Sequence, residues 1–258
     1  RFEDQAMIIT GAGSGLGQAA AQRLAADGAS LVLVDMNPEG LEATKNLVLE
    51  DNPDTKVELV TADVTKEEDV KKYVDAAVSA FGKIDGFFNN AGIEGKQNLT
   101  EDFGIDEFSK VVAVNLNGVF LGMQHVLKQM HQPGHGAIVN TASVGGIRGV
   151  GNQSGYAAAK HGVVGLTRNS AREYGEFGVR INAIAPGAIM TAMVENSLKQ
   201  LDPENPEEAG KQFVSVNPMK RFGKPEEVAG LVGFLLSKDA GFINGTVVPV
   251  DGGQHAMY

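Results

Sequence analysis

The 258-residue chain contains no cysteine, fewer basic than acidic residues, and no apolar run near the ~20 residues that span a bilayer. Without cysteine it can form no disulfide, no thiolate nucleophile and no cysteine-based zinc site. This suits a reducing compartment, and we expect a cytoplasmic protein. The first residues, Arg1 to Asp4, lack the basic-then-apolar layout of a secretion signal. They also lack Met, which is consistent with a native start further upstream.

Acidic side chains set the charge of the chain. It has 22 Lys and Arg against 32 Asp and Glu, for a net charge of −10. A nucleic-acid binder needs clustered Lys and Arg to neutralise phosphates, so the charge argues against a nucleic-acid partner. It argues equally against binding to an anionic membrane. The five histidines show no metal-ligand spacing with acidic residues, and we predict no metal site.

Short apolar runs alternate with helical patterns. Strands are predicted at 6–10, 30–35, 57–60, 84–88, 137–141, 179–184 and 246–250. Helices are predicted after the first strand up to about residue 28, and at 38–50, 66–80, 106–131, 153–174 and 225–236. This alternation implies parallel pairing through right-handed crossovers, and fully apolar strands indicate a sheet covered on both faces.

We therefore predict an α/β fold, a doubly wound, Rossmann-like parallel sheet of about seven strands with helices on both faces. The length favours one domain over residues 1–258, with two small domains as the second interpretation. An insertion at about 188–220 includes the linker-like stretch 202–210, and we expect it to be a substrate lid. The ligand is expected at the carboxyl ends of the strands.

Glycine is frequent: 33 of the 258 residues, or about 13%, against a usual share of about 7%. One cluster of glycines follows the first strand, at 10–17. Glycines there allow a sharp turn and a close approach of pyrophosphate to a helix start. Asp35 ends the second strand, where its carboxylate can bind the ribose hydroxyls and repel a 2′-phosphate. We therefore favour NAD over NADP. Asp63 could reach the adenine amino group or cap the helix that follows, and the spacing alone does not separate the two.

Tyr156 and Lys160 lie four residues apart in a predicted helix and so share one face. A nearby ammonium favours the tyrosine anion, so the pair could exchange a proton with an alcohol or carbonyl. A surface pair is the alternative. Ser143 ends the fifth strand, 13 residues earlier, where it could hold a substrate oxygen or be only a loop residue.

Together these motifs resemble the short-chain dehydrogenase/reductase family, in its single-domain NAD(P)-dependent branch. The resemblance spans the chain through Thr10-Gly11-x-x-x-Gly15-x-Gly17, Asn89-Asn90-Ala91-Gly92, Asn115, Ser143, Tyr156-x-x-x-Lys160 and Pro186-Gly187. It implies that Tyr156 is the general acid/base and that Lys160 lowers its pKa and binds the nicotinamide ribose. It also implies that Ser143 orients the carbonyl and that Asn115 supports a water relay.

The resemblance places the family's adenine-pocket acid at Asp63 and implies a homotetramer. A face of small residues on the helix 153–174 could serve a subunit contact or pack on the chain's own sheet. Taken with the glycine loop and Asp35, the predicted NAD(H) site comprises Gly11, Ser14, Gly15, Leu16, Gly17, Asp35, Met36, Asp63, Val64, Asn89, Ala91, Gly92, Tyr156, Lys160, Pro186, Gly187, Ile189 and Thr191.

The predicted substrate site adds loop and lid residues. It comprises Glu94, Ser143, Gly145, Ile147, Arg148, Asn152, Tyr156, Met190 and Met193. Met190, Met193, Val194, Leu198 and Leu201 would make an apolar helix face that covers a ring-shaped ketone or simply packs on the core. Glu94 and Arg148 could pair with each other, or Glu94 could meet a cationic substrate group.

We therefore expect an NAD(H)-dependent oxidoreductase that acts on a small secondary alcohol or ketone, with Tyr156 as acid/base. A cyclic ketone such as a substituted cyclohexanedione is favoured. Aryl amino-alcohols or aminoketones are the main alternative. The intact acid/base set argues against a non-catalytic NAD-binding sensor. Asp35 and the negative net charge argue against an enzyme that acts on carrier-bound acyl chains.

Overall fold

The seven apolar runs form one parallel sheet. The computed structural model describes residues 1–256. Its strands are β1 (Ala6–Thr10), β2 (Ser30–Asp35), β3 (Val57–Thr61), β4 (Gly86–Asn89), β5 (Gly136–Thr141), β6 (Val179–Pro186) and β7 (Val247–Val250). Their order is β3-β2-β1-β4-β5-β6-β7, with every pair parallel. The predicted fold class is confirmed, and β4 differs from its predicted range by two residues at its start and one at its end.

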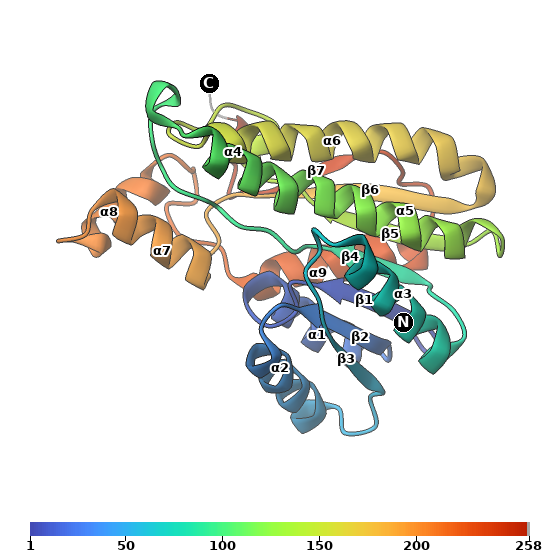
Figure 1. Ribbon diagram of the computed structural model, residues 1–258. Coiled ribbons are helices and arrows are strands. Elements are labelled where there is room, and N and C mark those ends of the chain that lie inside the picture. Colours follow the sequence, from blue (N-terminus) through green and yellow to red (C-terminus); the bar gives the residue numbers. More distant parts are fainter. Residues whose placement is uncertain (257–258) are drawn as a thin grey trace.

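Helices cover both faces of this sheet (Figure 1). One face packs on α1 (Gly15–Ala26), α2 (Pro38–Asp51) and α9 (Pro225–Leu236). The other packs on α3 (Glu67–Phe81), α5 (Gly118–His131) and α6 (Ser154–Tyr174). Within β1, Ile8 belongs to the second core, whereas Met7 and Ile9 belong to the first, because successive side chains point to opposite faces. Both cores are therefore built from the same strands.

The chain reverses its winding direction at β1, which lies between β2 and β4. Connections from β1 run outward to β2 and β3, and the chain then returns to β4 on the other side. At such a switch point the loops at the carboxyl ends separate and leave a crevice. The glycine-rich loop after β1 and the residues after β4 border this crevice.

The long pattern predicted as one helix over 106–131 is interrupted. It forms α4 (Ile105–Val112), a π-helical turn (Ala113–Asn117) and α5. Single π-helical turns inside α-helices are rare and are often found at functional sites. This one carries Asn115, whose side chain is fully buried.

Two helices occupy the insertion that follows β6. They are α7 (Ala192–Leu201) and α8 (Pro206–Ser215), and they project from one end of the sheet (Figure 1). The Thr191 side chain caps α7 by accepting from the Val194 N–H. Asn205 caps α8, and Pro206 occupies its first turn, where proline is well tolerated.

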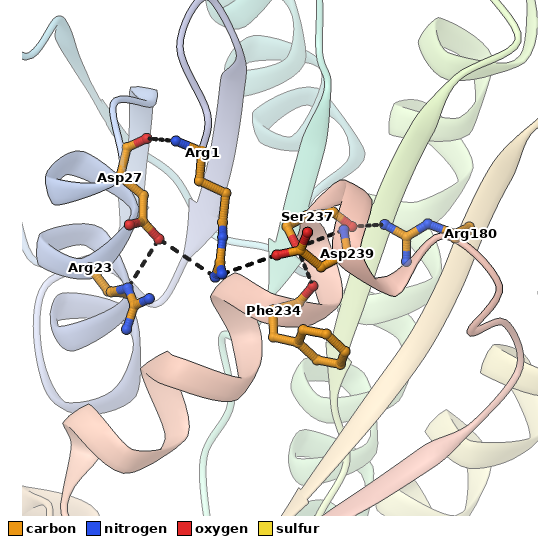
Figure 2. A network of polar contacts seen from close by, with 7 residues as sticks. All are labelled: Arg1, Arg23, Asp27, Arg180, Phe234, Ser237 and Asp239. Carbon is orange, nitrogen blue, oxygen red and sulfur yellow. Dashed lines mark hydrogen bonds and ion pairs between the residues drawn. The ribbon is translucent and has the colours of Figure 1, made fainter.

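A polar network joins the first residue to α1 and α9 at the edge where the strands begin (Figure 2). Arg1 contacts Asp239 at 3.0 Å and lies beside Asp27, which accepts from Arg23 at 3.0 Å. Arg180, the second residue of β6, donates to carbonyl oxygens at the end of α9 at 2.8 to 3.3 Å. These contacts satisfy helix carbonyls that have no partner within the helix.

Neither membrane spans nor metal clusters are found within residues 1–256. None of the helices there has both the length and the apolar character needed to cross a bilayer. In the same part of the chain, no group of three or more histidine or acidic side chains gathers as a metal site would require.

Candidate active site

The glycine-rich loop opens onto a cavity of about 330 Å³ at the carboxyl ends of the strands. Gly11 and Gly15 have φ of 66° and 53°, in the region that favours glycine. A Cβ at Gly17 would lie 2.0 Å from the Gly11 carbonyl oxygen, so a side chain there would break the turn. Gly11, Ser14, Gly15 and Leu16 line the cavity, whereas Gly17 supports the loop from beneath.

Asp35 lines the same cavity and lies beside Gly13 of the loop. Its Oδ2 accepts from the Gly13 N–H and its Oδ1 from the Asn37 N–H, both at 2.9 Å. The carboxylate is thereby fixed beside the glycine loop. Such a group can accept hydrogen bonds from ribose hydroxyls and repels a 2′-phosphate. Met36 follows it and is two-thirds exposed at the edge of the cavity.

Asp63 does not line the cavity, and its local contacts match those of a turn before α3. Its Oδ1 accepts from the Thr65 hydroxyl at 2.7 Å and from the Thr65 N–H at 3.0 Å. Its backbone N–H donates to Asp69. Val64 packs closely on Gly118 instead of facing the cavity. An adenine contact for these two residues therefore stays a prediction.

The residues after β4 join the central strands. Asn89 is buried and donates to the Asn140 side chain at 3.1 Å. The Thr10 hydroxyl accepts from the N–H groups of Asn90 and Ala91. The cavity is lined by Asn90, Ala91 and Gly92, so Asn89 supports the wall from behind. Asn90 belongs to the stretch 89–92, which the family resemblance places along the cofactor.

Asn115 anchors the wall from the π-helical turn. Its Oδ1 accepts from the Ile93 N–H at 2.8 Å, and its Nδ2 donates to the Ile93 carbonyl oxygen at 2.6 Å. A Cβ at Gly92 would come within 2.9 Å of the Asn115 Oδ1 and 3.5 Å of the Lys160 Nζ. Asn115 and Lys160 therefore meet around Gly92, as the predicted site requires.

Ser143, Tyr156 and Lys160 all line this cavity. The Ser143 hydroxyl oxygen accepts from the Gly145 N–H at 3.0 Å, which orients the hydroxyl. The Lys160 Nζ donates to the Thr141 carbonyl oxygen at 2.7 Å. It lies 5.6 Å from the centre of the Tyr156 ring. The helical spacing predicted this approach of the two side chains.

The pKa of Tyr156 is raised, whereas Lys160 was expected to lower it. Burial raises the pKa of Tyr156, the Ser143 hydroxyl opposes this, and the Glu94 charge adds to it. Burial also lowers the pKa of Lys160 to about 8. Because both groups are removed from water, loss of solvation outweighs the expected lowering of the tyrosine pKa by the lysine.

The segment after β6 closes the cavity. Pro186, Gly187, Ile189 and Thr191 all line it, as predicted. The Gly187 N–H donates to the Val250 carbonyl oxygen at 3.0 Å. The Thr191 side chain lies near Gly15, where an added Cβ would be 3.4 Å away. The segment thus reaches across to the glycine loop.

A second cavity of about 520 Å³ adjoins the first, and Ser143, Tyr156 and Met193 line both. Its wall includes the predicted residues Glu94, Gly145 and Arg148. Its apolar lining comprises Val144, Val150, Met193, Val194, Leu201 and Phe213. A flat ring compound in this cavity would pack its apolar faces on these side chains. A single polar group on its edge would face Ser143 and Tyr156.

Glu94 is held by side chains from three elements. Its Oε1 accepts from the amides of Gln97 and Gln153, and Gln97 also donates to Ser197 of α7 at 2.7 Å. Burial raises the pKa of Glu94, and hydrogen bonds from Ser197, Gln97 and Gln153 oppose the rise. These three partners line or border the cavity without having been predicted. No local pattern in the sequence indicates these long-range contacts.

The Glu94–Arg148 pair considered above does not form. The Arg148 Nη1 donates instead to the Gln254 carbonyl oxygen at 3.1 Å, while Glu94 is engaged by amides. Ile147 packs against the core, and Asn152 is exposed, with φ of 62°. Neither lines the second cavity, because the loop turns its other residues inward.

The apolar face of the insertion is divided between two cavities. Met193, Val194 and Leu201 line the substrate-sized cavity. Met190 and Leu198 line a different one, of about 560 Å³, on the other side of α7. Three of the five side chains of this face thus line the cavity beside Tyr156, and two do not. Met190 is one of these two, and its substrate contact stays a prediction.

Comparisons with known proteins extend over nearly the whole chain. A family model described as enoyl-(acyl carrier protein) reductase matches residues 11–255. Levodione reductase of Leifsonia aquatica is 66% identical over 100% of this chain and 97% of its own length. Cyclohexanol dehydrogenase of Acinetobacter sp. (strain SE19) is 44% identical over 98% of this chain and 95% of its own.

Solved structures agree with these similarities. A crystal structure of levodione reductase matches with a TM-score of 0.99, 66% identity and 100% coverage of both chains. NAD⁺-bound xylitol dehydrogenase matches with a TM-score of 0.92 and 36% identity, over 98% of this chain and 100% of that one.

Proposed function

The chain belongs to the short-chain dehydrogenase/reductase family and is an NAD-dependent alcohol dehydrogenase/ketone reductase, and we propose that its substrate is a cyclic ketone such as a substituted cyclohexanedione. The observation that carries the proposal is the meeting of two cavities at Ser143 and Tyr156. One is bordered by the glycine loop and Asp35, and the other is largely apolar.

The first cavity fits an NAD molecule. The turn at Gly11 and Gly15 leaves room for a pyrophosphate, which the free N–H groups at the start of α1 would hold. Asp35 would bind the ribose hydroxyls at one end. Lys160, at the other end, would bind the nicotinamide ribose, and Asn115 would hold the adjoining wall and a water chain in place. We retain the cofactor contacts of Met36, Asp63, Val64 and Asn89 as part of the proposal, although none of these residues lines the cavity.

NAD(H) bound in the first cavity would supply the hydride chemistry at the carbonyl carbon of the substrate. Ser143 donates to the substrate oxygen and holds it beside Tyr156. In reduction the Tyr156 hydroxyl gives its proton to that oxygen, and in oxidation the Tyr156 phenolate accepts the proton. The Lys160 ammonium close by stabilises the phenolate in the buried site.

A cyclic substrate fits the shape and the polarity of the second cavity. The relatives named levodione reductase and cyclohexanol dehydrogenase support this proposal. We further propose that the insertion at about 188–220 acts as a lid of a single domain, because α7 lines the cavity and contacts Gln97 through Ser197. Closure would exclude water during transfer.

We also propose a homotetramer in the cytoplasm. On α6, Gly155 and Gly162 pack against the chain's own Phe108 and Leu116, whereas Gly165 is exposed with no neighbour. Part of the small face is therefore available to a second copy. The absence of cysteine suits the cytoplasm. Light scattering of the purified protein tests the proposed assembly, and a monomer would refute it.

The substrate proposal is tested by following NADH and NADPH absorbance at 340 nm with a panel of ketones. Substituted cyclohexanediones, aryl aminoketones and acetoacetyl thioesters separate the candidates. Turnover of cyclic diketones with NADH supports the proposal. Aminoketone turnover in its place would make Glu94 a charge partner. NADPH-only activity would contradict the role of Asp35. NADH binding without any turnover would indicate a sensor.

A further inference from the structure

Arg148 lies in the wall of the substrate cavity with unused hydrogen-bonding capacity. Its Nη1 donates to the Gln254 carbonyl oxygen at 3.1 Å. Its Nε is buried and has no hydrogen-bond partner among residues 1–256. A buried donor without a partner is unfavourable, and most such groups in proteins are satisfied. A ligand cannot reach the buried Nε, but the Arg148 Nη2 also has no hydrogen-bond partner among residues 1–256, and Arg148 lines the cavity. The guanidinium therefore has a free donor at Nη2 for an acceptor that a ligand brings.

Arg148 is also tied to the reacting end of the cavity through the backbone. Ser143 caps a short 3-10 turn, Val144–Gly146, through its hydroxyl oxygen. The Arg148 N–H donates to the Val144 carbonyl oxygen at 3.1 Å. One tight turn therefore carries both the Ser143 hydroxyl and the Arg148 guanidinium. The spacing between these two donors is set by the loop and not by a flexible linker.

Two acidic residues, Glu94 and Asp202, also line the cavity. The Glu94 Oε1 accepts from the amides of Gln97 and Gln153, and the Asp202 Oδ1 accepts from the N–H groups of residues 204 and 205. Both carboxylates are thus engaged within the chain through one oxygen. Arg148 is the one basic side chain among the described lining residues, so it is the charged donor that the cavity offers to a second acceptor oxygen of the substrate.

We propose that Arg148 binds a second oxygen of the substrate, remote from the carbonyl that reacts at Tyr156. The inference rests on the proposed function, and it narrows the substrate class to cyclic ketones with a second carbonyl. Ser143 and Arg148 hold the two oxygens, while the apolar wall packs on the ring between them. Arg148 therefore contributes specificity and takes no part in proton or hydride transfer.

The test compares cyclohexane-1,4-dione with cyclohexanone, which differ by one oxygen. NADH oxidation at 340 nm gives kcat and KM for the wild type and for Arg148→Met, which keeps an unbranched chain but removes the donors. The variant should lose about 10- to 100-fold in kcat/KM on the dione, as expected for one hydrogen bond from a charged donor. The value for cyclohexanone should change by less than about threefold.

For each ketone, kcat/KM of the variant is divided by that of the wild type. This ratio does not depend on the intrinsic reactivity of the ketone or on the two equivalent carbonyls of the dione. Arg172→Met is the matched control, because Arg172 is exposed near the end of α6. It should leave both substrates unaffected. Arg148→Lys keeps the charge with a different geometry, so it should retain part of the preference for the dione. It also provides a second folded variant if Arg148→Met folds poorly.

Each outcome separates the inference from the proposed function. An equal loss on both ketones would overturn it, because Arg148 would then only hold the segment at Gln254. No loss on either ketone would overturn it as well. Failure of the wild type to reduce either ketone with NADH would refute the proposed function itself, and the assignment of Arg148 with it.

Discussion

Replacing Lys160 with methionine should make the cofactor-free protein more stable at neutral pH while abolishing its activity. The side chain is 3% exposed, and burial lowers its pKa to about 8 from an ordinary 10.5. At 1.36 kcal/mol per pKa unit, holding the charged form in this position costs about 3 kcal/mol. The Lys160 hydrogen bond to the Thr141 carbonyl oxygen, which the variant lacks, offsets about 1–2 kcal/mol of the gain.

The pH dependence gives the sharper test. Below pH 8 the lysine is charged in both folded and unfolded chains, so the full penalty applies. Between pH 8 and 10.5 the folded chain loses its proton first, and the penalty falls. The stability of the wild type should therefore rise relative to Lys160→Met across this window. By pH 9.5 roughly half of the difference of about 3 kcal/mol should have been recovered.

Urea unfolding followed by far-UV circular dichroism measures this difference, since the chain has no tryptophan for fluorescence. The protomer concentration must be the same for both proteins, because assembly shifts apparent stability. Lys128→Met, an exposed lysine on α5, is the matched control and should show no such trend. A difference between wild type and Lys160→Met that is constant from pH 7 to 9.5 would refute the reasoning.

Three further changes test other parts of the account. Asp35→Asn should lower kcat/KM for NADH about 10- to 100-fold, because the side chain beside Gly13 loses its charge. The ratio of kcat/KM for NADH to kcat/KM for NADPH should fall, and an unchanged ratio in steady-state assays would contradict this. Glu94→Gln removes a charge that raises the Tyr156 pKa, so the pH midpoint of alcohol oxidation should move to lower pH, and a shift to higher pH would be inconsistent. Arg180→Met should reduce the free energy of unfolding by about 1–3 kcal/mol in urea, because three carbonyl oxygens lose their donor, with kcat unchanged; a fall in kcat would link that edge to catalysis.

The sequence predicted what depends on short-range patterns. Apolar runs bounded by glycine and polar residues marked all seven strands, and their alternation with helices determined the fold class. The i,i+4 spacing of Tyr156 and Lys160 implied their approach because a helix fixes that geometry. Ser143 followed from the rule that ligands bind where parallel strands end.

Features that depend on tertiary contacts could not be predicted in this way. The π-helical turn forms where Asn115 bonds the backbone of Ile93, 22 residues away, and no local pattern encodes that pairing. Burial, and not the neighbouring lysine, dominates the pKa of Tyr156, and burial is known only once the fold is. Met190 lines another cavity because it precedes the Thr191 cap of α7, so it is not on the helix face that carries Met193 and Leu201.

The most direct test of the central claim is the rate of NADH-dependent reduction of cyclohexane-1,4-dione by Tyr156→Phe. The account predicts a fall in kcat of about 10²- to 10⁴-fold, the usual contribution of an acid/base group, with NADH binding retained in a direct titration. The phenyl ring still fills the same space, so binding should not suffer. A variant that keeps most of the wild-type kcat would contradict the account, because proton transfer would then come from another group.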